Sequence, residues 1–277
     1  MSTAFQTHRK LAGPILAGLL LLLFLFPIYW FYITSLKGPK EIDRFPPALW
    51  PEEPTLNILR VIAEANVAQY LSNSLIIATG ISLLTMGLGV GASWALVRIR
   101  GKWIDAILIT IVVLQMLPAA LMATPLYVIF SNLFLLDTRA AVVIAASAKS
   151  IPFVIILLRP SFLKIPKEVI EAAAVDGCTG WRLFRFIAFP LVRNSVIIIF
   201  ALIFMQAYGE YVFSRSFLNS DGKLPASVGL VTEFFGQYER DVTGAMAFGT
   251  IYLTPMLVVF VAIQRKLVSG LTAGAVK

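Results

Sequence analysis

The stretch from Ser161 to Pro190 reads SFLKIPKEVIEAAAVDGCTGWRLFRFIAFP and is rich in charge, although it lies between long apolar blocks. Its charged side chains include Lys167, Glu168, Glu171, Asp176, Arg182 and Arg185. The hydrocarbon core of a bilayer cannot solvate such groups, so this stretch must lie outside it. The sequence therefore predicts an exposed segment between two membrane spans.

Within this segment the residues predict a helix, a break and a second helix. Pro166 suits a first helical turn, because the N–H that proline lacks has no partner there. Residues 167–176 are mostly good helix formers, and Gly177 can adopt the left-handed conformation that ends a helix. We expect Thr179 to cap a second short helix that Pro190 stops.

The composition places the segment in a membrane protein. The 277 residues are 58% hydrophobic and 14% charged, with a mean hydropathy of +0.84, which predicts one integral membrane domain. The single cysteine, Cys178, excludes an intrachain disulfide. The sequence contains no glycine loop for phosphate, so we expect any ATP and Mg²⁺ to be bound by partner subunits and this chain to bind no cofactor. The spans carry no paired carboxylates, Ser/Lys dyad or histidine cluster, so an enzyme is not expected.

Six apolar segments are long enough to span the bilayer, which takes about 20 helical residues. We expect the spans at 11–36, 73–97, 104–132, 140–158, 191–213 and 242–264, with 65–72 as an interfacial approach and 214–241 as a polar outer loop. Gly87 and Gly91 predict close helix packing in the second span. The predicted division is a tail at 1–10, a first helix at 11–36, an outer loop at 37–68, a core at 69–265 that contains the loop 160–190, and a tail at 266–277.

The distribution of basic residues predicts the orientation. With six spans, 14 Lys and Arg residues lie on the side of the termini and of the 161–190 segment, and 8 lie on the other side. Cytoplasmic loops carry the excess of Lys and Arg. Both termini are therefore expected in the cytoplasm, together with the charged segment.

The charged segment resembles the EAA signature of ABC importer permeases, EAA-x3-G-x9-I-x-L-P. The matching residues are Glu171, Ala172, Ala173, Gly177, Ile187 and Pro190; Asp176 fits the Asp-Gly form of sugar permeases, and Phe189 replaces the leucine. The resemblance implies an all-α, type I ABC importer permease fold, in which Glu171, Ala172, Ala173, Asp176 and Gly177 couple the chain to an ATP-binding subunit. The small side chains of Ala172 and Ala173 would let two backbones approach closely. The alternative is an amphipathic helix on the membrane surface.

Two further features are similar to the MalG-type permeases, which transport maltose, trehalose and related sugars. The tail at 270–277 reads GLTAGAVK, and Tyr208-Gly209-Glu210-Tyr211 stands where many such permeases have Trp-Asn-Glu-Phe or Trp-Asn-Glu-Tyr. Glu210 fits this pattern, whereas Tyr208 and Gly209 depart from it. The resemblance implies a multi-pass permease of a bacterial or archaeal plasma membrane. It also implies partners: a second permease, two ATP-binding subunits, an extracytoplasmic solute-binding protein and membrane lipid, but no nucleic acid.

Other transporters remain alternatives at this point. One is an ABC permease for a polyamine, phosphate or an amino acid. Another is a proton-driven secondary transporter that uses Lys149 and Glu210 as its relay. The absence of an obvious inverted repeat and the presence of the EAA-like segment argue against the second.

Four polar residues are candidates for the translocation path: Gln115, Lys149, Gln206 and Glu210. A lysine near the middle of a span costs at least ~2.5–3.5 kcal/mol, so Lys149 either faces a polar cavity or satisfies carbonyls freed near Pro152. For Glu210, contact with headgroups or an arginine is favoured over a solute contact. Gln115 and Gln206 suit sugar hydroxyls and interhelical hydrogen bonds equally.

Overall fold

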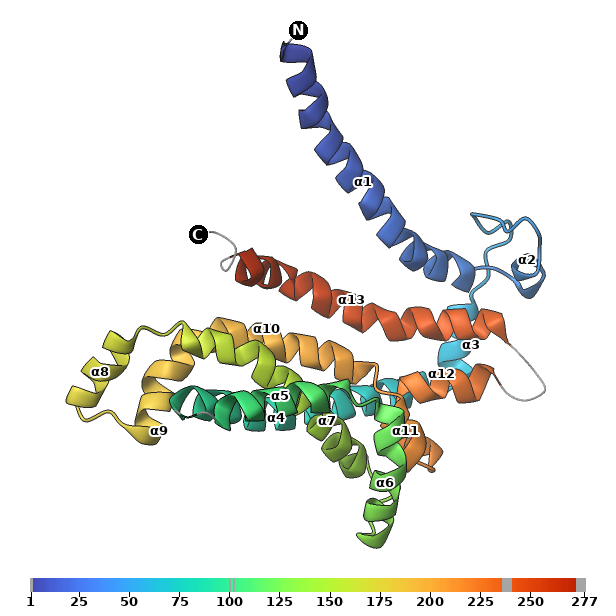
Figure 1. Cartoon of the computed structure of the whole chain (residues 1–277). Coiled ribbons are helices and arrows are strands. Elements are labelled where there is room, and N and C mark those ends of the chain that lie inside the picture. Colours follow the sequence, from blue (N-terminus) through green and yellow to red (C-terminus); the bar gives the residue numbers. More distant parts are fainter. Residues whose placement is uncertain (1, 100, 102, 236–240, 273–277) are drawn as a thin grey trace. The chain divides into compact units, whose positions relative to one another are not determined.

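The structure is a computed structural model that describes residues 2–99, 101, 103–235 and 241–272, and this part of the chain is helical almost throughout (Figure 1). The long helices are α1 (Ser2–Ser35), α4 (Val67–Arg98), α7 (Arg139–Leu163), α10 (Phe189–Tyr208) and α13 (Val242–Thr272). The shorter elements are α2 (Pro39–Ile42), α3 (Asn57–Glu64), α5 (Trp103–Met116), α6 (Ala119–Asn132), α8 (Lys167–Val175), α9 (Gly180–Leu183), the π-helix η1 (Phe184–Ala188), α11 (Val212–Phe217), the 3₁₀ turn η2 (Asp221–Lys223) and α12 (Ala226–Phe234).

Every predicted span falls on a helical segment. Five described runs are long and apolar enough to cross a membrane: Gly13–Ser35, Val67–Arg98, Arg139–Leu163, Gly180–Tyr208 and Val242–Gln264. α5 and α6 meet the same criterion only as a pair, and the pair is bent by 93°. The all-α membrane fold is confirmed, and the count reaches six when this pair makes one crossing. The side on which the termini lie stays a prediction.

The predicted third span, 104–132, is divided into two helices by a break. α5 ends at Met116, and Pro118 has the extended φ and ψ of −68° and 141° in front of α6. A residue before a proline is displaced from the helical region by the proline ring, which explains why the helix stops here. Pro125 lies inside α6 and makes no such break.

The second span begins earlier than predicted. α4 is already helical at Val67, so the separate interfacial approach at 65–72 is wrong. Its first turns have polar partners: the side-chain amides of Gln69 and Asn73 donate to the carbonyl of Gly222, at 2.8 and 3.0 Å. These hydrogen bonds stabilise the N-terminal turns of α4, so the helix begins before the predicted span at residue 73.

Pro190 does not stop a helix. The chain is helical from Gly180 to Tyr208, through α9, η1 and α10, and Pro190 occupies the first turn of α10. A π-helical turn is wider than an α-helical one and breaks the regular hydrogen-bond ladder, which accommodates a residue without an N–H. Thr179 has the extended backbone of a cap, but its side chain makes no capping hydrogen bond.

The segment 214–241 is not simply a polar loop, as its composition suggested. It contains η2 and the helix α12, in which Ala226 and Val228 are completely buried. Ser74 on α4 accepts a hydrogen bond from the backbone N–H of Ala226 at 2.8 Å. The apolar side chains of α12 are thus part of the folded core.

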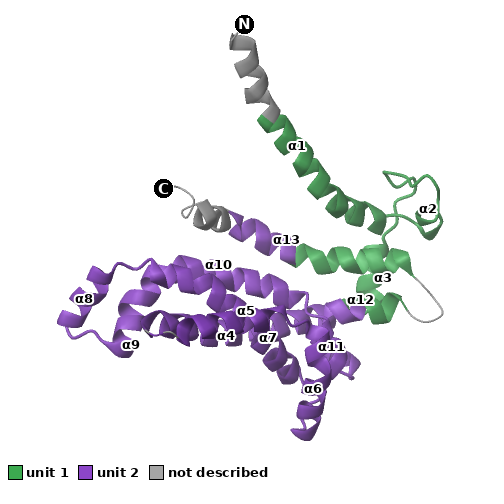
Figure 2. Cartoon of the chain, viewed as in Figure 1, with its two compact units in different colours: residues 1–67, 230–255 green, residues 68–229, 256–277 purple. Residues whose placement is uncertain are grey.

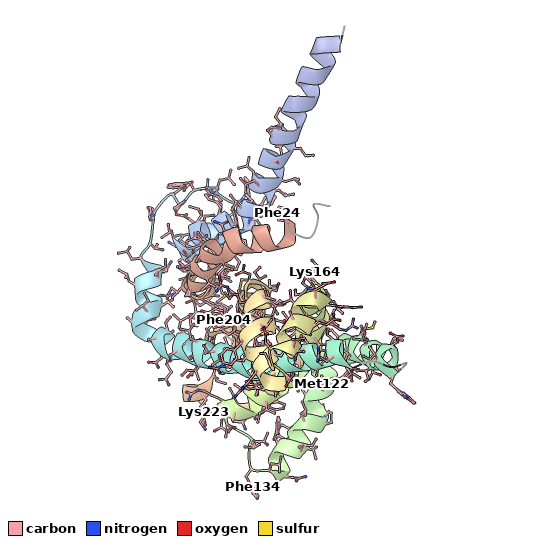
Figure 3. All side chains as sticks on the ribbon, turned by 90° about the vertical axis from the view of Figure 1, so that its left-hand side faces the viewer. Phe24, Met122, Phe134, Lys164, Phe204 and Lys223 are labelled. Carbon is pink, nitrogen blue, oxygen red and sulfur yellow. The ribbon has the colours of Figure 1, made fainter. Side chains whose placement is uncertain are left out.

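The chain divides into two compact units, which Figure 2 distinguishes by colour. The first comprises Met1–Val67 and Leu230–Pro255. In it the hydroxyl groups of Tyr32 and Thr254 form a hydrogen bond of 2.8 Å, and Arg60 pairs with Asp241 at 2.6 Å. The large apolar side chains of α1 from Ile15 to Phe26, such as Phe24, are not covered by the rest of the chain (Figure 3).

The second unit comprises Ala68–Gly229 and Met256–Lys277 and contains the charged segment. Its core includes Val142, Val154 and Leu158 of α7, all completely buried. α4 approaches α7 closely at two glycines, because a Cβ built on Gly80 or Gly89 would lie 2.9 Å from Val143 or 2.6 Å from Val154. The predicted pair was the wrong one: Gly87 and Gly91 have no neighbour within 4 Å of a Cβ.

Candidate functional site

The charged segment forms a short helix that ends in a complete C-terminal cap. Gly177 has a φ of +74° at the end of α8, as the sequence predicted. The N–H of Gly177 donates to the carbonyl of Ala174 at 3.1 Å, and the N–H of Cys178 donates to the carbonyl of Ala173 at 2.8 Å. This pair of hydrogen bonds is the Schellman motif, which turns the chain sharply from α8 toward α9.

The predicted coupling residues separate into exposed and buried positions. Glu171, Ala172, Asp176 and Gly177 are exposed, whereas Ala173 is 5% exposed and packs within the chain itself. The expectation that Ala172 and Ala173 both face a partner is therefore wrong for Ala173. The reason is geometric, since consecutive residues of a helix point about 100° apart. Val175 adds an apolar side chain that is 87% exposed.

An aromatic cluster lies beside this segment, where the end of α4 meets α7, α9 and η1. The ring of Trp94 lies 5.4 Å from that of Phe162 and 6.2 Å from that of Phe184, and Trp181 lies 5.1 Å from Phe184. A groove of about 310 Å³ opens here, lined by Gly91, Trp94, Arg98, Gly180, Trp181, Leu183 and Phe184. These contacts fix the end of α4 against the helical run that follows the exposed segment.

A second cavity, of about 230 Å³, lies where α10 ends and α5 gives way to α6. It is lined by Ile81, Ala119, Ala146, Lys149, Ser150, Gln206, Ala207, Gly209, Glu210, Tyr211, Val212 and Phe213. Three of the four predicted path residues therefore meet in one place. The fourth, Gln115, is not in the lining, and its buried Oε1 has no hydrogen-bond partner.

Lys149 reaches the break between α5 and α6. Its Nζ donates to the carbonyl of Leu117 at 3.2 Å, directly before Pro118. The alternative that it satisfies carbonyls freed near Pro152 is wrong, because its hydrogen bond goes to Leu117 in the break between α5 and α6. Lys149 therefore lines a cavity, which is the first of the two alternatives, and its ammonium also donates to a carbonyl at the break before α6 rather than near Pro152.

Glu210 caps the helix α11. Its carboxylate accepts from the N–H groups of Phe213 and Ser214, at 2.7 and 2.8 Å, and from the hydroxyl of Ser214 at 2.5 Å. The expected contact with headgroups or an arginine is wrong, because the carboxylate turns back to the orphan N–H groups of the next helix. The sequence analysis did not select Tyr211 or Ser150 as candidates for the translocation path. Both line the cavity, and they follow the selected residues Glu210 and Lys149 directly in the sequence.

A third polar cluster fixes the turn between α6 and α7 to the segment around η2. Asp137 accepts from the N–H groups of Asn219 and Ser220, at 3.0 and 2.9 Å, and from Lys223 Nζ at 2.6 Å. These hydrogen bonds, that from Lys223 foremost, hold the pKa of the Asp137 carboxyl well below its usual range. Arg139 joins the cluster by donating to Asn73 at 2.6 Å.

The chain matches the family model described as binding-protein-dependent transport system inner membrane component over residues 87–272. Among curated proteins it is 30% identical to the inner membrane ABC transporter permease protein YcjP of Escherichia coli, over the full length of both chains. It is also 30% identical to the diacetylchitobiose uptake system permease protein DasC of Streptomyces coelicolor, over 91% of each chain. The trehalose transport system permease protein SugB of Mycobacterium tuberculosis is 28% identical, over 91% of this chain and 92% of that one.

Solved structures show the same fold. A chain of a bacterial ABC transporter involved in the import of the acidic polysaccharide alginate superposes with a TM-score of 0.78 at 19% identity, over 96% of this chain and 98% of that one. The match to the family model covers the exposed segment, every residue that lines the cavity except Ile81, and all helices from the end of α4 onward. The chain therefore belongs to the family of binding-protein-dependent transport system inner membrane components, and it is a multi-pass permease subunit of an ABC transporter.

Proposed function

We propose that this permease imports a sugar or a sugar-like solute and forms half of the translocation path. The observation that carries the proposal is the cavity at the end of α10, where Lys149, Gln206 and Tyr211 bring polar groups into an otherwise apolar bundle. A solute rich in hydroxyl groups needs a few convergent donors and acceptors in such a cavity. The relatives named for diacetylchitobiose and trehalose support a glycoside as the solute.

The exposed helix α8 is the proposed coupling element. Glu171, Ala172 and Asp176 would contact an ATP-binding subunit, with Gly177 setting the turn behind them and Ala173 holding the helix to the rest of the chain. ATP and Mg²⁺ would be bound by that subunit. Because a ligand shifts only an equilibrium between states that it binds differently, closure of the ATP-binding subunits must favour the outward-facing state.

The proposed assembly contains a second, similar permease, two ATP-binding subunits and a solute-binding protein. The family description supports the last of these, because it names the transport system as binding-protein-dependent. In this proposal both termini are cytoplasmic, the segment 214–241 meets the binding protein, and the chain itself carries no enzymatic activity. Family membership sets aside the proton-driven transporter, whereas an ABC permease for a polyamine, phosphate or an amino acid is the remaining competitor.

The test is ATP-dependent uptake by the assembled complex in proteoliposomes. Radiolabelled monosaccharides, disaccharides and glycosyl polyols are compared with spermidine, phosphate and a mixture of amino acids. We expect uptake of at least one glycoside, dependent on both ATP and the binding protein. Uptake of a non-sugar solute alone would assign the chain to the competing class.

A further inference from the structure

Among the residues that the structure describes, no acidic side chain forms an ion pair with Lys149. The ion pairs among the described residues join Arg44 with Glu52, Arg60 with Asp241, and Lys223 with Asp137. The one hydrogen bond of the Lys149 ammonium within this part of the chain goes to the carbonyl of Leu117. An ammonium has three donors, so two of them remain available for a solute.

The carboxylate that shares the cavity is already engaged. Glu210 directs its oxygens to the first N–H groups of α11, and its backbone carbonyl accepts from the hydroxyl of Ser227 at 2.5 Å. The charge of Glu210 is thus balanced by the amide groups of the helix end. The cavity consequently offers an uncompensated cation beside neutral polar groups, namely the amide of Gln206 and the hydroxyl of Tyr211.

The position of Lys149 in a membrane span makes its unpaired charge energetically costly. It lies near the middle of α7, a span of 25 residues, where an isolated charge is unfavourable by at least ~2.5–3.5 kcal/mol. A neutral side chain such as glutamine could also donate to the Leu117 carbonyl. The hydrogen bond to the Leu117 carbonyl therefore does not account for a positive charge at this position.

We propose, building on the proposed function, that Lys149 recognises an anionic group of the solute, and that the transported class is glycosides that carry a carboxylate or a sulfonate. The ammonium would pair with the anionic group, while Gln206 and Tyr211 would bond hydroxyls of the sugar ring. The pairing would occur in a cavity of about 230 Å³ with a mostly apolar lining, and a hydrogen bond between two charged groups is stronger than one between neutral groups.

The test compares a matched pair of probes, radiolabelled methyl β-D-glucuronide and methyl β-D-glucoside, in proteoliposomes that contain the full complex and one binding protein. Wild type should take up the glucuronide in preference to the glucoside. Lys149→Gln should lower glucuronide uptake by about tenfold or more and spare the glucoside, because a charge-assisted hydrogen bond is lost. Lys149→Arg should retain most of the preference. All variants use the same binding protein. Its selectivity therefore cancels when the ratio of glucuronide to glucoside uptake is compared between variants.

Two controls separate recognition from folding. Lys164→Gln removes an exposed charge that follows α7 and should leave the uptake ratio unchanged (Figure 3). Pull-down of the ATP-binding subunits and basal ATPase activity report assembly of each variant. An assembled Lys149→Gln complex with an unchanged ratio would overturn the inference, as would a loss of assembly that Lys149→Arg does not restore. If wild type takes up only the neutral glucoside, the inference falls and the sugar assignment stands; if it takes up no glycoside at all, the proposed function falls as well.

Discussion

Gly177 lies in the left-handed region, with a φ of +74°, and no atom lies within 4 Å of the position where a Cβ would be. A side chain there meets no steric clash, so the penalty of substitution is conformational and amounts to roughly 1–2 kcal/mol. We predict that Gly177→Val weakens the cap of α8 and lowers the ATPase activity that loaded binding protein stimulates in the purified complex.

Gly177→Asn is the matched control, because asparagine tolerates the left-handed region better than valine does. It should retain most of the stimulated ATPase activity. Equal activity of the valine variant and wild type would show that the conformation of this turn does not matter for coupling.

Asp137 provides a prediction that depends on pH. Its pKa is depressed by the hydrogen bonds from Lys223, Ser220 and Asn219, so the stabilisation is complete above the unfolded-state pKa of about 3.9 and is lost as the pH falls toward the folded-state pKa. Asp137→Asn should therefore lower the melting temperature at pH 7 and at pH 5, and the difference from wild type should shrink below about pH 4.

Thermal unfolding of the purified chain at these pH values measures the difference. Asp221→Asn is the control, since that carboxyl group is exposed on the same segment. A difference between wild type and Asp137→Asn that stays constant down to pH 3 would contradict the assigned cause.

The residue-level predictions from sequence succeeded where the local chemistry decides. The glycine after a helix adopts a positive φ because the C-terminal cap requires it, and the sequence neighbours alone indicate this. Glu210 was misjudged because its partners belong to a helix, α11, that the sequence did not predict. Tertiary surroundings, rather than the residue type, determine what a carboxylate binds at such a position.

At the scale of helices, the contact between α4 and α7 depends on Gly89. A Cβ at this position would lie 2.6 Å from Cγ1 of Val154, which is completely buried. We predict that Gly89→Ala destabilises the chain by about 1–3 kcal/mol through overpacking, and that adding Val154→Ala restores part of the loss. Thermal melting of the detergent-solubilised complex measures both.

Gly87→Ala, two residues earlier in α4, is the matched control. No atom lies within 4 Å of its added Cβ, so alanine should be neutral or stabilise the helix by up to about 1 kcal/mol. Equal destabilisation by both substitutions would refute the packing argument.

Hydropathy located the helices but not their interruptions. Apolar runs of sufficient length are enough to predict spans, and each predicted span contains a helix. The burial of α12 depends on contacts with distant segments, such as that of Ser74 with Ala226, and the π-helix before Pro190 is a departure from the regular helix. A pattern of 3.6-residue periodicity contains no information on such contacts, so these elements could not be predicted.

At the scale of the whole chain, the bent pair α5–α6 determines the topology. Each helix has 14 residues and measures roughly 21 Å, which is too short to cross a core of roughly 30 Å alone. If the pair crosses once, the chain has six spans and both termini share one side. If the pair re-enters the side from which it came, the termini lie on opposite sides.

Cysteine labelling in intact cells distinguishes these topologies. In a Cys178→Ser background, cysteine is introduced at Trp103, the first residue of α5, or at Phe134, after α6; these side chains are 82% and 93% exposed. We predict that only the cysteine at 134 reacts with an impermeant thiol reagent from outside. Reaction at both positions, or at neither, would mean that the pair does not cross.

α4 has a mechanical consequence for the transporter. Its 32 residues measure roughly 48 Å, which is considerably more than the thickness of the bilayer core. The helix contains no proline and is therefore expected to be rigid. One end is tied through Asn73 to the segment around Gly222, and the other, through Trp94, to the rings of Phe162 and Phe184. A displacement of either end of α4 is therefore transmitted along the helix to the other end, because no break in the helix lies between them.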